Sequence, residues 1–407
     1  HAWAMYPGLS QGCMATLEAH GTPEQQKMFL HKLVAGTWTG TMCLTESHCG
    51  SDLGMLKTKA EKNTDGSYNL TGTKIFISAG EHDMSENIVH IVIARLPGAP
   101  EGTKGISLFA VPKFNVSAEG EKEDRNAVTC GSIEHKMGIK GSATCVINFD
   151  GAKGYLIGTE NRGLNCMFTF MNSARIGTGL EGLASSETAF QGALAYAKDR
   201  LQFRSMKGVQ NPAGPADPII VHPDVRRMLL TQKAFAEGNR ALAIYAMKLV
   251  DITLYSKDEA DKQLSEAKLA FLTPIVKAFL TETAQEATSY GMQVYGGHGF
   301  IKEWGMEQLA RDTRICTMYE GTTGIQAIDL LARKVVGSNG KLLDVFTQEV
   351  RDYCLSIRDK GQFNAWSNAI EVHLDEWKQI TADITKRAAS NPDELGAASV
   401  DYLMYSG

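Results

Sequence analysis

The chain has 407 residues, of which 43% are hydrophobic and 21% are charged, and its formal net charge is −5. Because single hydrophobic cores stop growing at about 250 to 300 residues, this length predicts two or three domains rather than one. The composition is typical of a folded globular protein and argues against extensive disorder. The slightly acidic balance and the lack of any basic run argue against nucleic-acid binding.

The eight cysteines form no CxxC pair and no Cys/His spacing typical of a metal site. We therefore expect no metal and a reduced, cytoplasmic environment. The longest apolar stretches, such as 87–96, are far shorter than the about 20 residues that cross a bilayer, so we expect no membrane span. The chain starts at His1 without a signal-peptide pattern, and we expect it to be an internal piece of a longer protein.

Residues 1–36 mix small and apolar side chains and contain one clear helix start. Thr22 is suited to the N-cap and Pro23 to the first helical position, which predicts a helix that continues through Leu33. We interpret this segment as the remnant of an N-terminal helical domain.

From residue 37 to 158 the pattern changes to short β-rich runs separated by Gly, Asp and Asn. The clearest runs are 74–78, 88–95, 106–111 and 144–149, and Asp65-Gly66 marks a turn. No helical crossover lies between these runs. The pattern therefore predicts a central antiparallel β domain and argues against a parallel, nicotinamide-binding sheet.

After Gly163 the apolar residues recur at helical spacing. Three long helices are predicted: one through 176–201, one starting near Pro223, and one over roughly 266–290 with Pro274 as a kink. Together they suggest a helical bundle over 159–337. A further amphipathic helical segment is predicted over 338–407, after the Gly337-Ser338-Asn339-Gly340 break.

Two segments of the β-rich region could bind a ligand. Residues 42–52 read MCLTESHCGSD, and their hydroxyls and exposed backbone N–H groups suit an oxygen-rich ligand. Phe76 and Ser78 share a strand face, so the ring could cover a flat cofactor while the hydroxyl bonds its rim. Taken alone, each composition favours the simpler interpretation, a polar surface loop and a strand with a core aromatic.

Two further segments lie in the helical region. Residues 293–299 read QVYGGHG directly after a helix; alone, this is a helix cap with His298 as a hydrogen-bonded structural histidine rather than a base. Residues 318–326 read MYEGTTGIQ and place Glu320 at a loop–helix junction among apolar and small residues. Desolvation would make such a carboxylate a stronger base, although a lone Glu followed by Gly usually only starts a helix.

In this order and spacing, the four segments resemble those of the acyl-CoA dehydrogenase family, whose members carry a TE-x4-SD loop, a W-I-T type strand end, a Q-x-x-G-G-x-G turn and a YEGT motif. The resemblance covers about residues 1–337. It implies an α+β fold with an N-terminal helical part, a central antiparallel β domain and a C-terminal four-helix bundle. It also implies FAD held between the last two domains and a neighbouring subunit.

Residue by residue, the resemblance implies roles for the positions that match the family motifs. The FAD contacts would be Met42, Leu44, Thr45, Ser51, Phe76, Ser78, Arg200, Phe203, Gln293, Gly296, Gly297 and Thr322. The CoA substrate would contact Ser51, Asn172, Arg175 and Gly321. Phe76 and Ser78 would cover the flavin face and its N5 edge, whereas Arg200 and Phe203 would reach the FAD of an adjacent subunit.

The implied chemistry is removal of the pro-R α-proton of an acyl-CoA by Glu320, with hydride transfer from the β-carbon to flavin N5. The thioester carbonyl would accept hydrogen bonds from a ribityl hydroxyl of FAD and from the Glu320 backbone N–H, which stabilise the developing enolate. The implied partners are an acyl-CoA substrate, an electron-transfer flavoprotein as acceptor, and further copies of the chain in a homodimer or homotetramer.

The chain departs from the commonest family pattern at Ser47, His48, Cys49, Phe76, Ser78 and Gly324. With the segment after Gly337, these departures resemble the larger bacterial subgroup that includes 3-methylmercaptopropionyl-CoA dehydrogenase and broad-range fatty acyl-CoA dehydrogenases. Three alternatives share the architecture: an acyl-CoA oxidase, a flavin monooxygenase and a non-catalytic scaffold. Glu320 argues against a monooxygenase, and the retained site residues argue against a scaffold.

Overall fold

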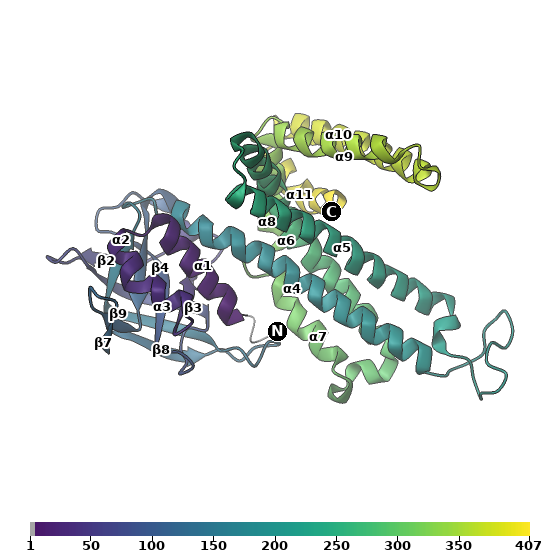
Figure 1. The fold of residues 1–407 in the computed structure, drawn as a ribbon, viewed down its shortest axis with the longest axis horizontal. Helices are drawn as coiled ribbons and strands as arrows, with labels where there is room; N and C mark the ends of the chain where they lie inside the picture. Colours follow the sequence, from purple (N-terminus) through teal and green to yellow (C-terminus); the bar gives the residue numbers. More distant parts are fainter. Residues whose placement is uncertain (1–4) are drawn as a thin grey trace. The chain divides into compact units, whose positions relative to one another are not determined.

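The computed structural model describes residues 5–407, which pack into two compact units that divide between Gly177 and Thr178. The division falls within one long helix, α4 (Gly163–Asp199). The first unit contains the β-rich region and the second is helical (Figure 1).

Three short helical segments precede the sheet: α1 (Met5–His20), α2 (Pro23–Gln25) and α3 (His31–Val34), with a π-helical stretch over Gln26–Leu30. The predicted start at Thr22 is confirmed. Its hydroxyl accepts from the Gln25 N–H, while the Gln25 side chain accepts from the Thr22 N–H, so two donors that a helix start leaves unpaired are satisfied reciprocally.

The described part of the first unit contains one seven-stranded sheet and a two-stranded one. The strands are β1 (Trp38–Cys43), β2 (Lys59–Lys62), β3 (Tyr68–Ser78), β4 (Asn87–Arg95), β5 (Ile106–Pro112), β6 (Phe114–Val116), β7 (Lys122–Arg125), β8 (Val128–Ile133) and β9 (Thr144–Ile157). The pairings β4–β2–β3–β9–β5–β4 form a closed path, as in a barrel, to which β1 and β8 are added.

Most of these pairings are antiparallel, as predicted. However, β1 pairs with β4 in parallel, and the short pairing of β2 with β4 is also parallel. The expectation of a purely antiparallel sheet was wrong at these pairings. It relied on the lack of helical crossovers, whereas a parallel pair needs only a connection of about a dozen residues or more. Here β2 and β3 supply that connection between β1 and β4.

Two apolar clusters hold the first unit together. One lies between the helices and the sheet and includes Leu17, Phe29, Trp38 and Phe170. The other consists mainly of strand residues and includes Leu70, Ile77, Val92, Phe109, Ile147 and Phe149. The start of α4 belongs to the first cluster, since Phe170 is fully buried there and a Cβ at Gly12 of α1 would lie 2.4 Å from its ring.

The second unit is built around α6 (Glu259–Tyr295), which packs along α5 (Pro223–Tyr255) and carries Pro274 in its interior. Next come α7 (Met306–Thr313) and α8 (Thr323–Ile328), which continues as a π-helical turn over Asp329–Val336. Gly179 and Gly182 of α4 allow close approach to α6, because a Cβ on either would lie about 3 Å or less from α6 atoms.

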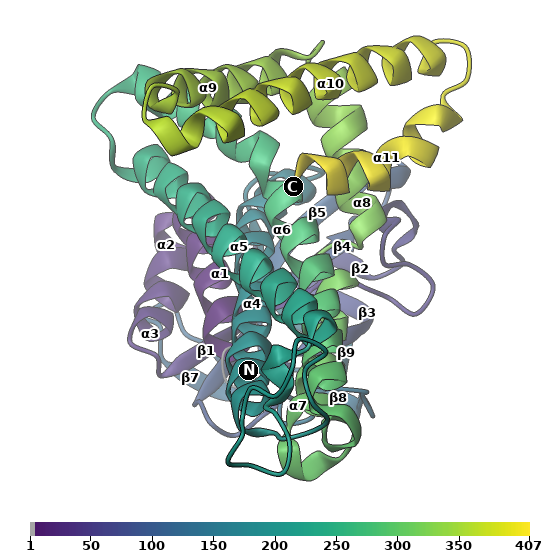
Figure 2. The same ribbon diagram turned by 90° about the vertical axis from the view of Figure 1, so that its right-hand side faces the viewer.

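The segment after Gly337 forms α9 (Lys341–Ile357), α10 (Asn364–Ala388) and α11 (Asp393–Ser406). Helices α9 and α10 lie side by side (Figure 2). Trp377 of α10 and Tyr402 of α11 join the same apolar cluster as Phe271 of α6. The predicted architecture, with N-terminal helices, a central β domain, a C-terminal helical bundle and an extra helical segment, is confirmed. Within residues 5–407, no helix combines the length and apolar character that a bilayer crossing requires.

Candidate active site

The loop after β1 and the end of β3 lie together in the first unit. The Thr45 carbonyl accepts the Ile75 N–H at 2.9 Å, and the Leu44 carbonyl accepts the Lys74 ammonium at 2.9 Å. Two segments that the sequence assigns to one ligand, at Thr45 and at Phe76 with Ser78, are thereby neighbours. Met42 and Leu44 are half-buried beside them.

Phe76 occupies a β-bulge rather than a regular strand position. The register of β3 against β9 slips between Lys74 and Ile77, and Phe76 takes a positive φ of 61°. Its side chain is 60% exposed, Ile77 is buried and Ser78 is half-buried, so the interpretation of Phe76 as a core aromatic is wrong. An exposed ring on a strained backbone is a common feature of ligand-binding sites.

Glu46 fixes the shape of the same loop. Its carboxylate accepts the Lys57 N–H at 2.8 Å, the Thr58 N–H at 3.0 Å, the Thr58 hydroxyl at 2.7 Å and the Lys74 ammonium at 2.9 Å. Burial alone would raise the pKa of Glu46, but the Lys74 charge and these donors lower it to about 2. Burial acts in the same way against the charge on Lys74 and lowers its pKa. We take the charged pair as the native state because every Glu46 partner is a donor.

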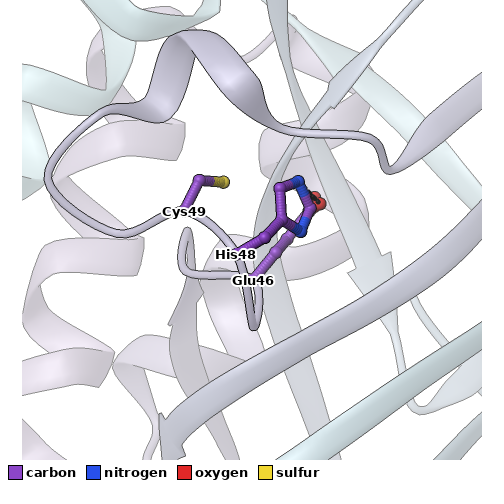
Figure 3. Close-up of side chains that lie close together, drawn as sticks. All are labelled: Glu46, His48 and Cys49. Carbon is purple, nitrogen blue, oxygen red and sulfur yellow. Dashed lines mark ion pairs between the residues drawn. The ribbon is translucent and has the colours of Figure 1, made fainter.

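Glu46, His48 and Cys49 place three potential metal-ligand atoms within 4.8 Å of one another (Figure 3). The surrounding groups argue against a metal there. Glu46 already accepts four hydrogen bonds and pairs with a buried ammonium, and burial with the nearby Glu46 charge raises the pKa of the Cys49 thiol. A cation would have to displace Lys74 and deprotonate Cys49. The cluster is better explained as the hairpin in which Glu46 and Cys49 pair through their backbones.

The residues expected to contact CoA differ in exposure. Ser51 and Asn172 are exposed, whereas Arg175 on α4 is only 8% exposed, with its guanidinium 6.0 Å from the Phe168 ring centre. Their assignment to CoA stays a prediction.

In the second unit, Arg200 and Phe203 start the loop between α4 and α5. Phe203 is 81% exposed and has a positive φ of 57°, so its ring is available to a ligand or another subunit. The loop is organised by Asp217, which sequence reasoning missed. Its buried carboxylate accepts the backbone N–H groups of Ser205, Gln210 and Asn211 and pairs with Arg204 at 3.2 Å.

The glycine turn ends α6 as predicted. Gly296 has a positive φ of 59°, and Gln293, Gly296 and Gly297 are exposed. His298 is a hydrogen-bonded structural histidine, as the simpler interpretation held: its Nδ1 lies 3.0 Å from the Tyr196 hydroxyl and its ring stacks on Trp304 at 4.5 Å. This aromatic contact fixes the turn and leaves its backbone accessible.

Glu320 lies at the predicted loop–helix junction and is half-buried. It adopts φ 56°, followed by Gly321 at φ 90°, and Thr322 then caps α8 by accepting the Ile325 N–H at 3.3 Å. The Glu320 carbonyl accepts the Gln326 amide at 3.0 Å. Its carboxylate is thus carried on an uncommon left-handed turn whose backbone is held from α8.

Two charged side chains adjoin this turn, the buried Lys277 and the half-buried Glu181, and sequence reasoning missed both. Lys277 of α6, fully buried, donates to the Gly321 carbonyl at 2.6 Å. Glu181 of α4 accepts the Tyr319 hydroxyl and the Cys316 thiol. Since Lys277 and Gln293 are 16 residues apart on α6, about 24 Å of helix separates the Glu320 turn from the glycine turn. These two predicted site segments therefore do not form one compact pocket within the unit.

Two hollows of the second unit are lined largely by residues of the segment after Gly337. One is lined by Lys268, Asp344, Gln348, Glu349, Asp352 and Lys378, at α6, α9 and α10. Four of its five charged side chains form the pairs Lys268–Glu349, at 2.7 Å, and Lys378–Asp344, at 2.8 Å, and Asp352 accepts the Gln348 amide.

Family models match three successive parts of the chain. Residues 41–152 match the acyl-CoA dehydrogenase middle domain, residues 161–335 the acyl-CoA dehydrogenase C-terminal domain, and residues 346–407 an acetyl-CoA dehydrogenase C-terminal like domain. Over its whole length the chain is 44% identical to 3-methylmercaptopropionyl-CoA dehydrogenase of Ruegeria pomeroyi, of which it covers 68%. The chain belongs to the acyl-CoA dehydrogenase family. The prediction of an oxidoreductase of this family is thereby confirmed.

Other members of the acyl-CoA dehydrogenase family agree in sequence and in fold. The broad-specificity linear acyl-CoA dehydrogenase FadE5 of Mycobacterium tuberculosis is 36% identical over 99% of this chain and 68% of its own length. The structure of Caenorhabditis elegans ACDH-11 in complex with C11-CoA superposes with a TM-score of 0.85 at 22% identity, over 98% of this chain and 66% of that one. The chain thus spans about two thirds of the length of these relatives.

Proposed function

We propose that this chain oxidises an acyl-CoA thioester to the trans-2-enoyl-CoA with FAD, and that Glu320 removes the α-proton. The observation that carries the proposal is the Glu320 turn: a glutamate at φ 56°, held by neighbouring side chains, in a member of the acyl-CoA dehydrogenase family. A glutamate with a left-handed backbone conformation is uncommon. Such strained residues persist only where the surrounding structure holds them, and they cluster at functional sites.

The residues of each unit suit FAD. Phe76 offers an exposed ring beside the Thr45 loop, and Ser78 offers a hydroxyl two residues on. Phe203 and the exposed Gly296 backbone offer an aromatic and N–H groups in the second unit. FAD, when bound, would supply the acceptor for the β-hydride. A FAD complex of a Bacillus anthracis acyl-CoA dehydrogenase has this fold, with a TM-score of 0.78 at 23% identity, which supports the assignment.

The protein's part in the reaction is alignment and electrostatics. The Glu320 carboxylate takes the α-proton, and its backbone N–H donates to the thioester carbonyl, where negative charge develops. Ser51, Asn172, Arg175 and Gly321 would bind the CoA portion. A rigid turn at Glu320 matters because a misplacement of about 1 Å can slow such a step by about 100-fold.

The substrate is a fatty acyl-CoA or 3-methylmercaptopropionyl-CoA. Two relatives that match nearly the whole chain, 3-methylmercaptopropionyl-CoA dehydrogenase and the broad-specificity linear acyl-CoA dehydrogenase FadE5, support these two classes. Electrons would then pass to an electron-transfer flavoprotein, and the active form would be a homodimer or homotetramer. The exposed Arg200 and Phe203 at the start of their loop support a site shared between subunits.

The test is anaerobic reduction of the purified yellow protein with a panel of short, long, branched and methylthio acyl-CoAs. Wild type should lose its flavin absorbance with at least one of them. Glu320→Gln should stay yellow and not bleach, because the amide cannot accept the proton. Glu266→Gln, an exposed glutamate on α6, is the matched control and should bleach like wild type.

Three outcomes would count against the proposal. Substantial bleaching of Glu320→Gln would remove Glu320 from the base role. A colourless wild-type protein that binds no added FAD would favour the scaffold. Stoichiometric hydrogen peroxide formation under air would identify an acyl-CoA oxidase instead of an electron-transfer flavoprotein partner.

A further inference from the structure

The backbone at Glu320 needs support from its surroundings. Glu320 and Gly321 have φ values of 56° and 90°, and a left-handed conformation is unfavourable for a non-glycine residue such as Glu320. An isolated segment of this sequence would relax away from it. What holds the turn in place therefore decides where the Glu320 carboxylate points.

One support acts on the residue before Glu320. The Tyr319 hydroxyl donates to the Glu181 carboxylate on α4, which also accepts the Cys316 thiol at 3.4 Å. Burial raises the pKa of Tyr319, and the neighbouring Glu181 adds to the shift, so the phenol stays protonated and remains a donor at neutral pH. The contact joins α4 to the turn across 138 residues of sequence.

The second support acts on the residue after Glu320. The Lys277 ammonium, fully buried on α6, donates to the Gly321 carbonyl at 2.6 Å. A buried charge is expensive to desolvate, and a charge-assisted hydrogen bond to a carbonyl offsets part of that penalty. A side chain at Gly321 would be strained, since φ is 90° there and a Cβ would lie 2.6 Å from the Gln326 amide unless that amide moved.

We propose that Glu181 and Lys277 are positioning residues for Glu320, with Glu181 holding Tyr319 on one side of it and Lys277 holding the Gly321 carbonyl on the other. The proposal rests on the proposed function, because it assigns these contacts to the placement of a base. The simpler alternative is that both contacts only stabilise the fold. The two differ in the reaction rate of folded protein.

The chain offers a matched control for each contact. Tyr245 also donates from its hydroxyl to a glutamate, Glu349, at 2.6 Å, and Lys268, like Lys277 on α6, pairs with Glu349 at 2.7 Å. Tyr245→Phe and Lys268→Met therefore remove a hydroxyl donor and an ammonium donor from contacts away from Glu320. They measure the effect of lost stability alone.

The experiment compares Tyr319→Phe and Lys277→Met with these controls in full-length, FAD-loaded protein. The readouts are the rate of anaerobic flavin reduction at saturating acyl-CoA, the KM for acyl-CoA and the thermal midpoint. We expect flavin reduction about 10- to 100-fold slower in both test variants, with KM changed less than about threefold, because misalignment affects the chemical step more than ground-state binding. The controls should keep the wild-type rate even where their midpoints fall.

Conservative changes at Glu181 separate placement from charge. Glu181→Gln keeps an oxygen that accepts the Tyr319 hydroxyl and should keep most of the rate, whereas Glu181→Leu should lose it as Tyr319→Phe does. If Lys277→Met does not fold, Tyr319→Phe, which removes a single oxygen atom, still decides the matter for Tyr319 and Glu181, and Lys277→Arg decides it for Lys277.

Wild-type rates in Tyr319→Phe and in the Lys277 variant would overturn the positioning role while leaving the proposed function intact, provided that wild type bleaches and Glu320→Gln does not. A wild-type protein that no acyl-CoA bleaches would overturn the proposed function and the positioning role together. The two failures are therefore distinguishable in one set of measurements.

Discussion

Glu46→Gln tests whether the buried Glu46–Lys74 pair holds the loop that carries Thr45. The substitution keeps the shape of the side chain and removes its charge. Four donors converge on the two Glu46 oxygens, and an amide has only one oxygen to offer them. One end of the side chain would therefore place an amide N–H against another donor, while the Lys74 ammonium would stay fully buried without its counter-ion.

The expected loss follows from two independent estimates. Removing one partner of a buried ion pair typically destabilises a protein by about 3 to 5 kcal/mol. The pKa of Glu46 is about 2, against 4.5 for an unperturbed glutamate, which corresponds to about 3 kcal/mol of stabilisation when the group is ionised. Both predict a fall in the thermal midpoint of the first unit on the order of 10 °C.

The sign of the pH dependence follows from the same shift. Because the folded protein holds the pKa of Glu46 below its unfolded value, this stabilisation is fully present above pH 4.5 and is lost as the pH falls toward 2. The difference in stability between wild type and Glu46→Gln should therefore be constant near neutral pH and should shrink between pH 4.5 and 2.

Thermal unfolding followed by circular dichroism, with FAD retention measured on the same samples, checks the prediction. Glu121→Gln is the matched control in the first unit, since its pair with Lys32 spans 3.6 Å and the Glu121 side chain is 71% exposed. We expect it to change stability by less than about 1 kcal/mol. Equal midpoints for Glu46→Gln and Glu121→Gln at neutral pH would refute the reasoning.

Three further outcomes can be measured. Gly321→Ala should retain the fold but lose most of its rate of flavin reduction, because its Cβ would meet the Gln326 amide and its φ of 90° disfavours a side chain; a wild-type rate would contradict this. Trp377→Ala should lower the stability of the second unit by about 3 to 5 kcal/mol in thermal unfolding, whereas the 65% exposed Trp366→Ala should lower it little. Asp217→Ala should make its loop susceptible to limited proteolysis, because three backbone N–H groups lose their acceptor; unchanged cleavage would show that the loop does not depend on it.

The fold could be predicted where the spacing of apolar residues and the residues at helix ends give a clear local signal. Thr22 with Pro23 marks a helix start, the glycine turn ends α6, and the apolar spacing after Gly163 gives the long helices. The parallel pairing of β1 with β4 could not be predicted, because strand direction depends on how the barrel closes and not on local pattern. The bulge at Phe76 was likewise invisible, since a single extra residue leaves the alternation on either side intact.

The buried charges were the main omission in the site. Lys277 and the Glu46–Lys74 pair are buried and Glu181 is half-buried, although these residue types are usually solvent-exposed, so their sequence context predicts a surface position. Each is buried in part or in full by contacts with residues far along the chain, such as Tyr319 for Glu181. Only Lys74 had a local signal of burial, because it begins the predicted strand 74–78, in which alternate side chains face the core.

Strained backbone links the site residues more closely than their spacing in the sequence does. In the described chain, seven non-glycine residues have positive φ, and three of them are Phe76, Phe203 and Glu320, each chosen from sequence motifs alone. Such conformations are rare for aromatic residues and cost free energy that folding must offset elsewhere. At Phe76 and Phe203 the strained backbone presents an exposed aromatic ring. At Glu320 it directs a carboxylate, and Lys277 and Glu181 hold the residues on either side of it. Backbone strain therefore indicates the same three residues as site residues as the sequence motifs do, and it does so independently of the family resemblance.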